Sequence, residues 1–180
     1  MYKRQAGIYD YRYSRNTTIT DVVWVPSGSQ AVSFPLDPSK QALFYTRNGQ
    51  QFAPPIANNL ASLTLSDDPI FVVQKAPPTL VVSQNKVYLL AEQGQTTTAS
   101  SFTLANGSQE NSFSWSAANL TPAWLAVNPA NGTATAAPTT VTVSATLNGL
   151  GLGTHTGSFT LNGGAAGSKI IQVVTLTPSE

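Results

Sequence analysis

The chain has 180 residues, of which 41% are apolar and only 9% are charged, with a net charge of +1. This balance excludes the basic surface that nucleic-acid binding needs, and no apolar run reaches the ~20 residues of a membrane span. The chain has no cysteine, which excludes thiolate chemistry, and its one histidine and eight carboxylates favour a protein that is not an enzyme and holds no cofactor.

Residues 1–5, Met-Tyr-Lys-Arg-Gln, read as a translated sequencing adaptor. The codons GTG-TAT-AAG-AGA-CAG at the end of a transposon adaptor encode this pentapeptide when GTG is taken as the start. The alternative is a short basic N-terminus. We expect a truncated metagenomic reading frame with missing upstream domains, so the lack of an apolar signal segment says nothing about secretion.

Residues 6–75 predict a domain made of strands. Alternating or β-branched runs predict strands at 8–13, 19–25, 31–36, 41–46, 60–65 and 70–73. Asn48-Gly49 is a strong signal for a hairpin turn between two of these runs. Residues 58–62 could form one turn of helix, and no other segment holds a convincing helical period.

A change in composition divides the chain into two halves. Residues 1–75 hold 12 of the 17 charged side chains, and residues 76–180 hold the other five. The change falls at residues 76–78, Ala-Pro-Pro, where two prolines fix φ and remove backbone donors. We therefore expect a first domain over 1–75, a short stiff linker over 76–78 and a second domain over 79–180.

The second half predicts a sandwich of short strands. The candidate strands are residues 80–82, 87–91, 101–104, 112–116, 124–127, 140–146, 155–161 and 170–177. About 100 residues with this strand spacing is the size of an immunoglobulin-like domain. Outward Ser and Thr, which fill 40 positions of the chain, keep strands soluble without charge, as is common in secreted bacterial modules. The predicted fold is all-β, with two tandem β-sandwich domains, the second immunoglobulin-like.

An ordered set of motifs supports a family resemblance for the second half. The set is Trp115, then Trp124-Leu125-x-Val127-x-Pro129-x-x-Gly132-Thr133, then Gly153-Thr154-x-x-Gly157. With its flanking strands, this region of about 79–178 resembles the BACON-type bacterial immunoglobulin-like domain. Such domains are accessory modules of secreted carbohydrate-active enzymes, proteases and surface proteins. The resemblance implies a spacer or a module that binds carbohydrate or mucin, located outside the cell or on its surface.

The first half carries a looser resemblance. The residues on which it rests are Val22-Val23-Trp24, the run 31–36, Leu43-Phe44-Tyr45-x-x-Asn48-Gly49 and Leu63-x-Leu65-x-x-x-Pro69-Ile70-Phe71-Val72. Over about 6–75 these are similar to the small C-terminal β-sandwich that follows the catalytic barrel of many glycoside hydrolases. Val25, where the family often has Ser, and Tyr45-Thr46-Arg47, where an Asp is common, depart from that pattern. The resemblance implies that a barrel with the paired carboxylates lies upstream.

The ionisable residues offer little chemistry. Glycoside hydrolysis needs two carboxylates on either side of the scissile bond, and only Asp67 and Asp68 are neighbours in sequence. Beside Pro69 they predict a turn, although a calcium site that uses their oxygens stays open. His155, on a predicted strand, has no indicated acid partner or oxyanion hole and is interpreted as a surface histidine. We expect no catalytic residue and no metal site.

The aromatic residues are the best candidates for a functional surface, because exposed rings stack on sugars or pack against another domain. Tyr9, Tyr11 and Tyr13 share one face of a predicted strand. They form either a glycan platform or the surface that packs on a missing domain, and we favour packing. Trp115 is a further candidate for such a platform, although its pattern favours the core, as do those of Trp24 and Trp124.

These observations predict the non-catalytic accessory region of a secreted bacterial carbohydrate-active enzyme. Its expected partners are a missing upstream domain of the same chain and a polysaccharide or glycan. Stalk modules of a bacterial cell-surface adhesin are the alternative.

Overall fold

The computed structural model of the protein describes residues 2–5, 7–108 and 112–177. These residues form strands and one short 3-10 turn, η1 (Gly164–Ala166), so the all-β prediction is confirmed. The chain divides into two compact units, Met1–Pro77 and Pro78–Glu180, and this division falls within the predicted linker of residues 76–78. Met1, the first residue of the predicted adaptor segment, lies outside the described residues.

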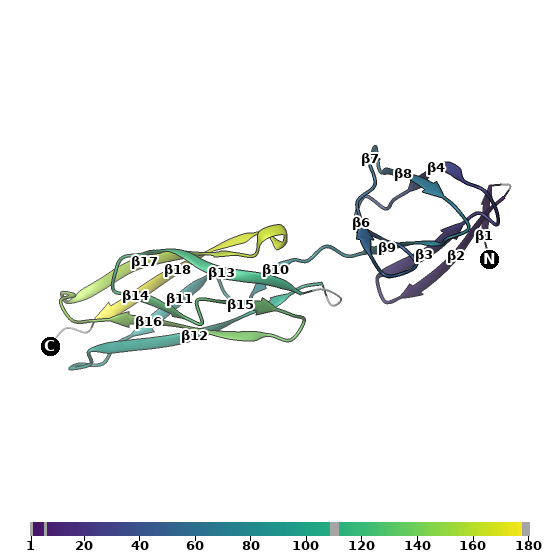
Figure 1. Cartoon of the computed structure of the whole chain (residues 1–180). Coiled ribbons are helices and arrows are strands. Elements are labelled where there is room, and N and C mark those ends of the chain that lie inside the picture. The colour runs from purple at the N-terminus through teal and green to yellow at the C-terminus, as the bar shows by residue number, and fades with distance from the viewer. Residues whose placement is uncertain (1, 6, 109–111, 178–180) are drawn as a thin grey trace. The chain divides into compact units, whose positions relative to one another are not determined.

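The first unit is a sandwich of two antiparallel sheets (Figure 1). The larger sheet consists, in spatial order, of β1 (Tyr2–Gln5), β2 (Ile8–Arg15), β3 (Thr18–Trp24), β9 (Ile70–Lys75), β5 (Gln41–Tyr45) and β6 (Gln51–Phe52). The smaller sheet consists of β4 (Gln30–Pro35), β8 (Leu60–Leu65) and β7 (Ile56–Ala57). Alternate residues of each strand face the space between the sheets. The core there is formed by Ile8, Val23, Val25, Phe34, Phe44, Ala61, Leu63, Leu65 and Val72.

Two predicted turns of this unit have different outcomes. Asn48-Gly49 joins β5 to β6, with Gly49 at φ 78°, so that hairpin is confirmed. The helical turn predicted at 58–62 is wrong. Asn58 and Asn59 instead join β7 to β8, with φ values of 51° and 59°. A two-residue hairpin of this kind needs positive φ at both central positions, and Asn tolerates that conformation.

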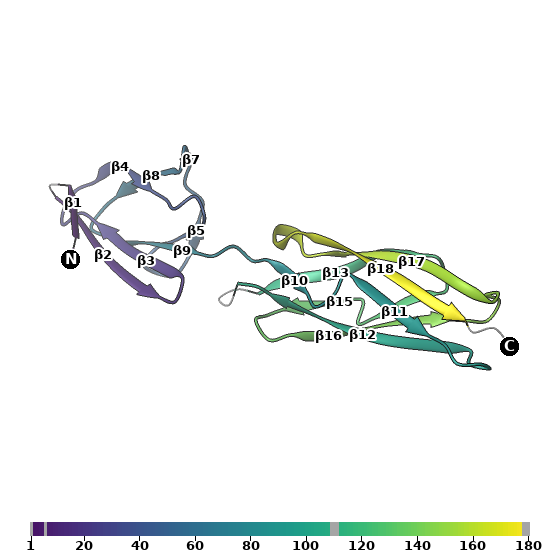
Figure 2. The ribbon, with the colours of Figure 1, turned by 180° about the vertical axis from the view of Figure 1, so that it is seen from behind.

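The second unit is an immunoglobulin-like sandwich. One sheet consists, in spatial order, of β10 (Leu80–Val82), β12 (Thr97–Asn106), β16 (Thr139–Thr146) and β14 (Leu125–Asn128). The other consists of β11 (Lys86–Leu90), β18 (Ser168–Thr177), β17 (Gly153–Asn162), β13 (Phe113–Thr121) and β15 (Asn131–Ala134). Figure 2 shows β11 beside β18; these two strands run parallel, while the other strand pairs among the described residues of this unit are antiparallel. Consecutive strands β10 and β11 therefore belong to different sheets.

The core of the second unit contains Trp115, whose side chain is 2% exposed. The segment at Asn131 and Gly132 is strand β15, paired with β13, and lies outside the strands predicted from sequence. Gly132 lies against the indole of Trp115, and a Cβ there would sit 3.2 Å from its Nε1. A side chain at this position of the neighbouring strand would require the indole to shift by a few tenths of an ångström.

Candidate functional site

The structure separates the four candidate site residues into two environments. Tyr9, Tyr11 and Tyr13 lie on the outer face of β2, where Tyr11 is 38% and Tyr13 is 62% exposed. Trp115 lies inside the core of the second unit. The core position that its sequence pattern favours is therefore confirmed, and its candidacy for an exposed platform is wrong, because Phe113 and Trp115 on β13 both point into the interior.

Trp24 joins the tyrosines of the first unit. It is the direct cross-strand neighbour of Tyr9 on β3. Its indole stacks on Tyr9 with a centroid distance of 5.3 Å and on Tyr11 with a distance of 5.5 Å, at interplanar angles of 16° and 10°. Trp24 does not belong to the core cluster, so the interpretation of Trp24 as a core residue is wrong. The apolar run of residues 22–25 concealed this, because both faces of the strand carry apolar side chains.

Cross-strand register extends this stack into a continuous surface. Tyr11 on β2, Val22 on β3, Phe71 on β9 and Tyr45 on β5 stand in one row across four strands. The next row holds Tyr13, Thr20, Val73 and Leu43. We call this surface the aromatic face; it comprises Tyr9, Tyr11, Tyr13, Val22, Trp24, Leu43, Tyr45, Phe71 and Val73.

The opposite face of the same strands is fixed by an ion pair whose carboxylate is buried. Asp21 is fully buried, and Arg12 donates to its carboxylate through Nε at 2.6 Å and Nη2 at 3.0 Å. Arg12 and Asp21 face inward. Because side chains alternate along a strand, their sequence neighbours Tyr11, Tyr13 and Val22 face outward. The ion pair and the core thus set which side chains form the aromatic face.

The ionisable candidates are not assembled into a site. Asp67 and Asp68 lie in an exposed turn between β8 and β9, where Asp68 is 3.6 Å from the guanidinium of Arg47. No group of three His, Cys, Asp or Glu side chains in the described part of the chain could hold a metal ion. His155 lies on β17, and its Nε2 is 2.7 Å from the carbonyl oxygen of Gly151. That contact gives the histidine a structural role at the rim of the second unit.

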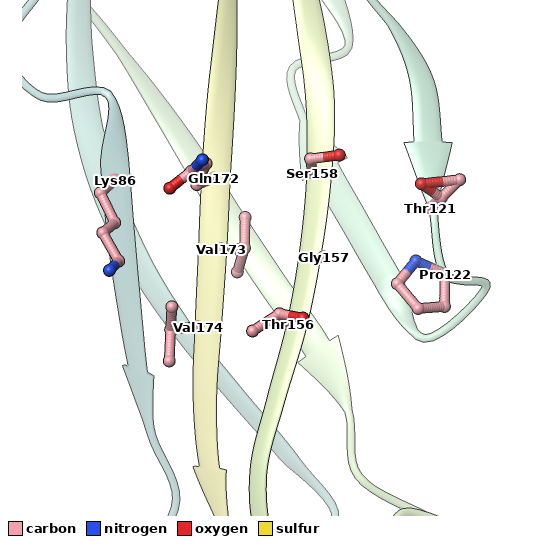
Figure 3. Close-up of a pocket in the computed structure, with 9 residues that line it drawn as sticks. All are labelled: Lys86, Thr121, Pro122, Thr156, Gly157, Ser158, Gln172, Val173 and Val174. Carbon is pink, nitrogen blue, oxygen red and sulfur yellow. The ribbon is translucent and has the colours of Figure 1, made fainter.

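A second surface feature was not predicted from the sequence. On the outer face of the five-stranded sheet lies a hollow of about 770 Å³ (Figure 3). Its lining includes Lys86, Gln172, Ser158 and Thr121, which come from β11, β18, β17 and β13. Local patterns could not reveal it, because β11, β13 and the β17–β18 pair come from separate parts of the sequence and meet only in the sheet.

Comparison with known proteins gives weak similarities. No family model matches the chain, and no curated protein matches it. The chain is similar to a Bacteroides ovatus GH5 xyloglucanase in complex with a XXXG heptasaccharide, at 16% identity and a TM-score of 0.43, over 56% of this chain and 19% of that one. It is also similar to the ASH/PapD-like domain of human CEP192, at 12% identity and a TM-score of 0.48, over 58% of this chain and 88% of that one.

A third similarity covers more of the chain. A protein of unknown function from Porphyromonas gingivalis W83 matches at 9% identity and a TM-score of 0.41, over 88% of this chain and 90% of that one. The chain spans about a fifth of the length of the xyloglucanase. No helix within the described residues has the length and hydropathy of a membrane span.

Proposed function

We propose that this chain is a non-catalytic accessory region of a secreted bacterial carbohydrate-active enzyme. The first unit packs its aromatic face against a catalytic domain of the same protein. The second unit serves as a spacer or a weak glycan-binding module. The observation that carries this proposal is the continuity of the aromatic face across β2, β3, β9 and β5.

Packing explains this face better than glycan binding does. A glycan platform needs flat ring faces that are open to solvent, whereas Trp24 and Tyr9 are half-buried and stack on each other. Val22 lies between Tyr11 and Phe71 in one cross-strand row, and Val73 lies beside Leu43 in the next, so that aliphatic and aromatic side chains alternate as on the interior face of a sandwich. Contiguous apolar surface of this kind on a soluble domain marks an interface.

The carboxylates also support a non-catalytic role. Asp21 is buried and held by Arg12, and Asp68 lies in an exposed turn, 3.6 Å from the guanidinium of Arg47. Glycoside hydrolysis requires two carboxylates on either side of the scissile bond, whereas Asp67 and Asp68 are adjacent residues of one exposed turn. In this proposal the catalytic carboxylates belong to another domain.

A stalk of a cell-surface adhesin is the second candidate. It is favoured by the hydroxyl-rich surface of the second unit, where Lys86, Glu92 and Lys169 are the charged residues of the described part. A stalk module needs no docking face. The aromatic face of the first unit therefore distinguishes the two candidates.

The test begins with the DNA upstream of the codon for Ala6. The longer reading frame and the 180-residue chain are then both expressed with 5-fluorotryptophan, which gives one ¹⁹F signal for each of the three tryptophans. We expect a barrel-type catalytic domain upstream, and a Trp24 signal that is sensitive to a soluble paramagnetic agent in the short chain and protected in the long one. Buried Trp115 is the internal control and should be protected in both.

Two results would overturn the proposal. One is a longer frame that encodes only further sandwich repeats of the Trp-Leu-x-Val-x-Pro type, which would support the stalk. The other is a Trp24 signal equally sensitive in both chains, which would show that the aromatic face does not pack on the neighbouring domain. Trp24→Phe assigns the signal without removing an aromatic ring from the face.

A further inference from the structure

The hollow of the second unit contains a row of polar side chains that crosses four strands. Lys86 is paired in register with Gln172, Gln172 with Ser158, and Ser158 with Thr121. Figure 3 shows these four residues following one another across β11, β18, β17 and β13. Three strand spacings give the row a length of about 14 Å, which suits a short oligosaccharide better than a single sugar.

An irregularity in β13 opens the hollow. The pairing of β13 with β17 shifts register between Ala118 and Thr121, and Asn119 has a φ of 56°. Thr121 and Pro122 then approach β17 so closely that a Cβ on Gly157 would lie 2.8 Å from the Thr121 carbonyl oxygen. Bulges of this kind redirect side chains and occur next to binding sites. The absence of a side chain at Gly157 therefore allows Thr121 and Pro122 to lie this close to β17 at the edge of the hollow.

The side chains of the row have unused hydrogen-bonding capacity. Within the described residues, the side chains of Gln172, Ser158 and Thr121 make no hydrogen bond to another protein group. The Lys86 ammonium lies 5.3 Å from the centroid of the Tyr88 ring, which holds it beside the row through a cation–π contact. The hollow thus presents one cation, an amide and two hydroxyls to solvent.

The surroundings of the row are neutral and partly apolar. Tyr88, Val174 and Thr156 form the adjacent row on the same sheet face, and Tyr88 is 57% exposed. Among the described residues no carboxylate lines the hollow, and Glu92, the acidic residue in that part of the unit, follows the far end of β11. The positive charge of Lys86 is therefore not neutralised within the hollow, which favours an anionic ligand.

We propose that the hollow binds an acidic oligosaccharide built from uronic acid units. Lys86 pairs with a sugar carboxylate, Gln172, Ser158 and Thr121 hydrogen bond to ring hydroxyls, and the ring of Tyr88 supports an apolar sugar face. This inference deepens the proposed accessory function, on which it rests, by giving the second unit a ligand class. Its test does not involve the aromatic face of the first unit.

The experiment measures binding of a galacturonic acid hexamer to the full 180-residue chain by titration calorimetry and by ¹H–¹⁵N chemical shifts. We expect shift changes confined to residues around 86–88, 121–122, 156–158 and 172–174. Lys86→Ala should weaken binding about tenfold, the loss expected for one charge-assisted hydrogen bond. Gln172→Ala should also weaken it, and added salt should weaken binding of the unmodified chain because the ion pair is exposed.

Lys169→Ala is the matched control, because it removes the same charge from an exposed position of β18 outside the hollow. It should leave the affinity unchanged within twofold. The proposal is overturned if the hexamer does not bind, if Lys169→Ala weakens binding as much as Lys86→Ala, or if uncharged cellohexaose binds equally well. Each of these results would leave the ¹⁹F test of the first unit unaffected, so failure of this inference is distinguishable from failure of the accessory role.

Discussion

Arg12 and Asp21 form a two-pronged ion pair between neighbouring strands, in which the aspartate is fully buried and the arginine side chain is 39% exposed. The pair lies in register on β2 and β3 and faces the interior of the sandwich. A carboxylate in that position depends on its donors, because a buried charge without them is costly.

Removal of the arginine should therefore destabilise the first unit. Arg12→Ala is expected to lower the free energy of unfolding by about 2–3 kcal/mol, because the buried carboxylate loses two charge-assisted hydrogen bonds. Urea denaturation measures the change. Arg47→Ala is the matched control; its 3.6 Å pair with Asp68 joins side chains that are 71% and 73% exposed. An equal loss in the control would contradict the structural role given to Arg12.

The assignment of Trp115 to the core predicts a large effect of its truncation. Trp115→Ala should cost the second unit about 3–5 kcal/mol, because it removes a buried indole and leaves a cavity. Thermal and urea unfolding measure this change. Tyr88→Ala on the outer face of the same unit should cost only about 0.5 kcal/mol. Trp115 would have to be placed on the surface if both variants had similarly small effects.

Gly157 should not tolerate a side chain. A Cβ there would lie 2.8 Å from the Thr121 carbonyl oxygen and 3.1 Å from Cδ of Pro122, so the backbone must move. Gly157→Ala is expected to destabilise the second unit by about 1–3 kcal/mol. Gly151→Ala, where no atom lies within 4 Å of the added Cβ, is the control for the substitution itself. Unchanged unfolding midpoints in both variants would refute the close approach.

The turn after β4 predicts a depressed carboxyl pKa. The Ser39 hydroxyl, at 2.6 Å, is the largest influence that holds the pKa of Asp37 below its ordinary value of 3.8, followed by the Ser39 backbone N–H at 2.9 Å and by Lys40. Because the pKa is lower in the folded state, the carboxylate contributes stability above about pH 3.8. That contribution is lost as the pH falls through the folded-state value.

An NMR titration of the Asp37 carboxyl checks this prediction. Ser39→Ala removes the hydroxyl donor but keeps the backbone N–H, so the pKa of Asp37 should rise part of the way toward 3.8. An unchanged pKa in this variant would show that the hydroxyl does not hold the carboxylate.

The strands and their faces followed from the sequence because the alternation of side chains is local. The runs at 8–13, 80–82 and 170–177 predicted β2, β10 and β18 closely. The short strand at Asn131 and the turn at Asn58-Asn59 were missed, because an Asn-Gly pair and an Asn-Asn pair have several local conformations and their neighbours select one.

Residue patterns alone predicted the all-β class, a boundary near the two prolines and a shared face for Tyr9, Tyr11 and Tyr13. The tertiary structure was needed to show that Trp24 joins those tyrosines, and it confirms the burial of Trp115 that its sequence pattern favoured. It also brought Lys86, Gln172, Ser158 and Thr121 into one row. The facing direction of a side chain was predictable because it depends only on the alternation along its own strand. Its neighbours across the sheet depend on hydrogen-bonded register between strands that are distant in sequence.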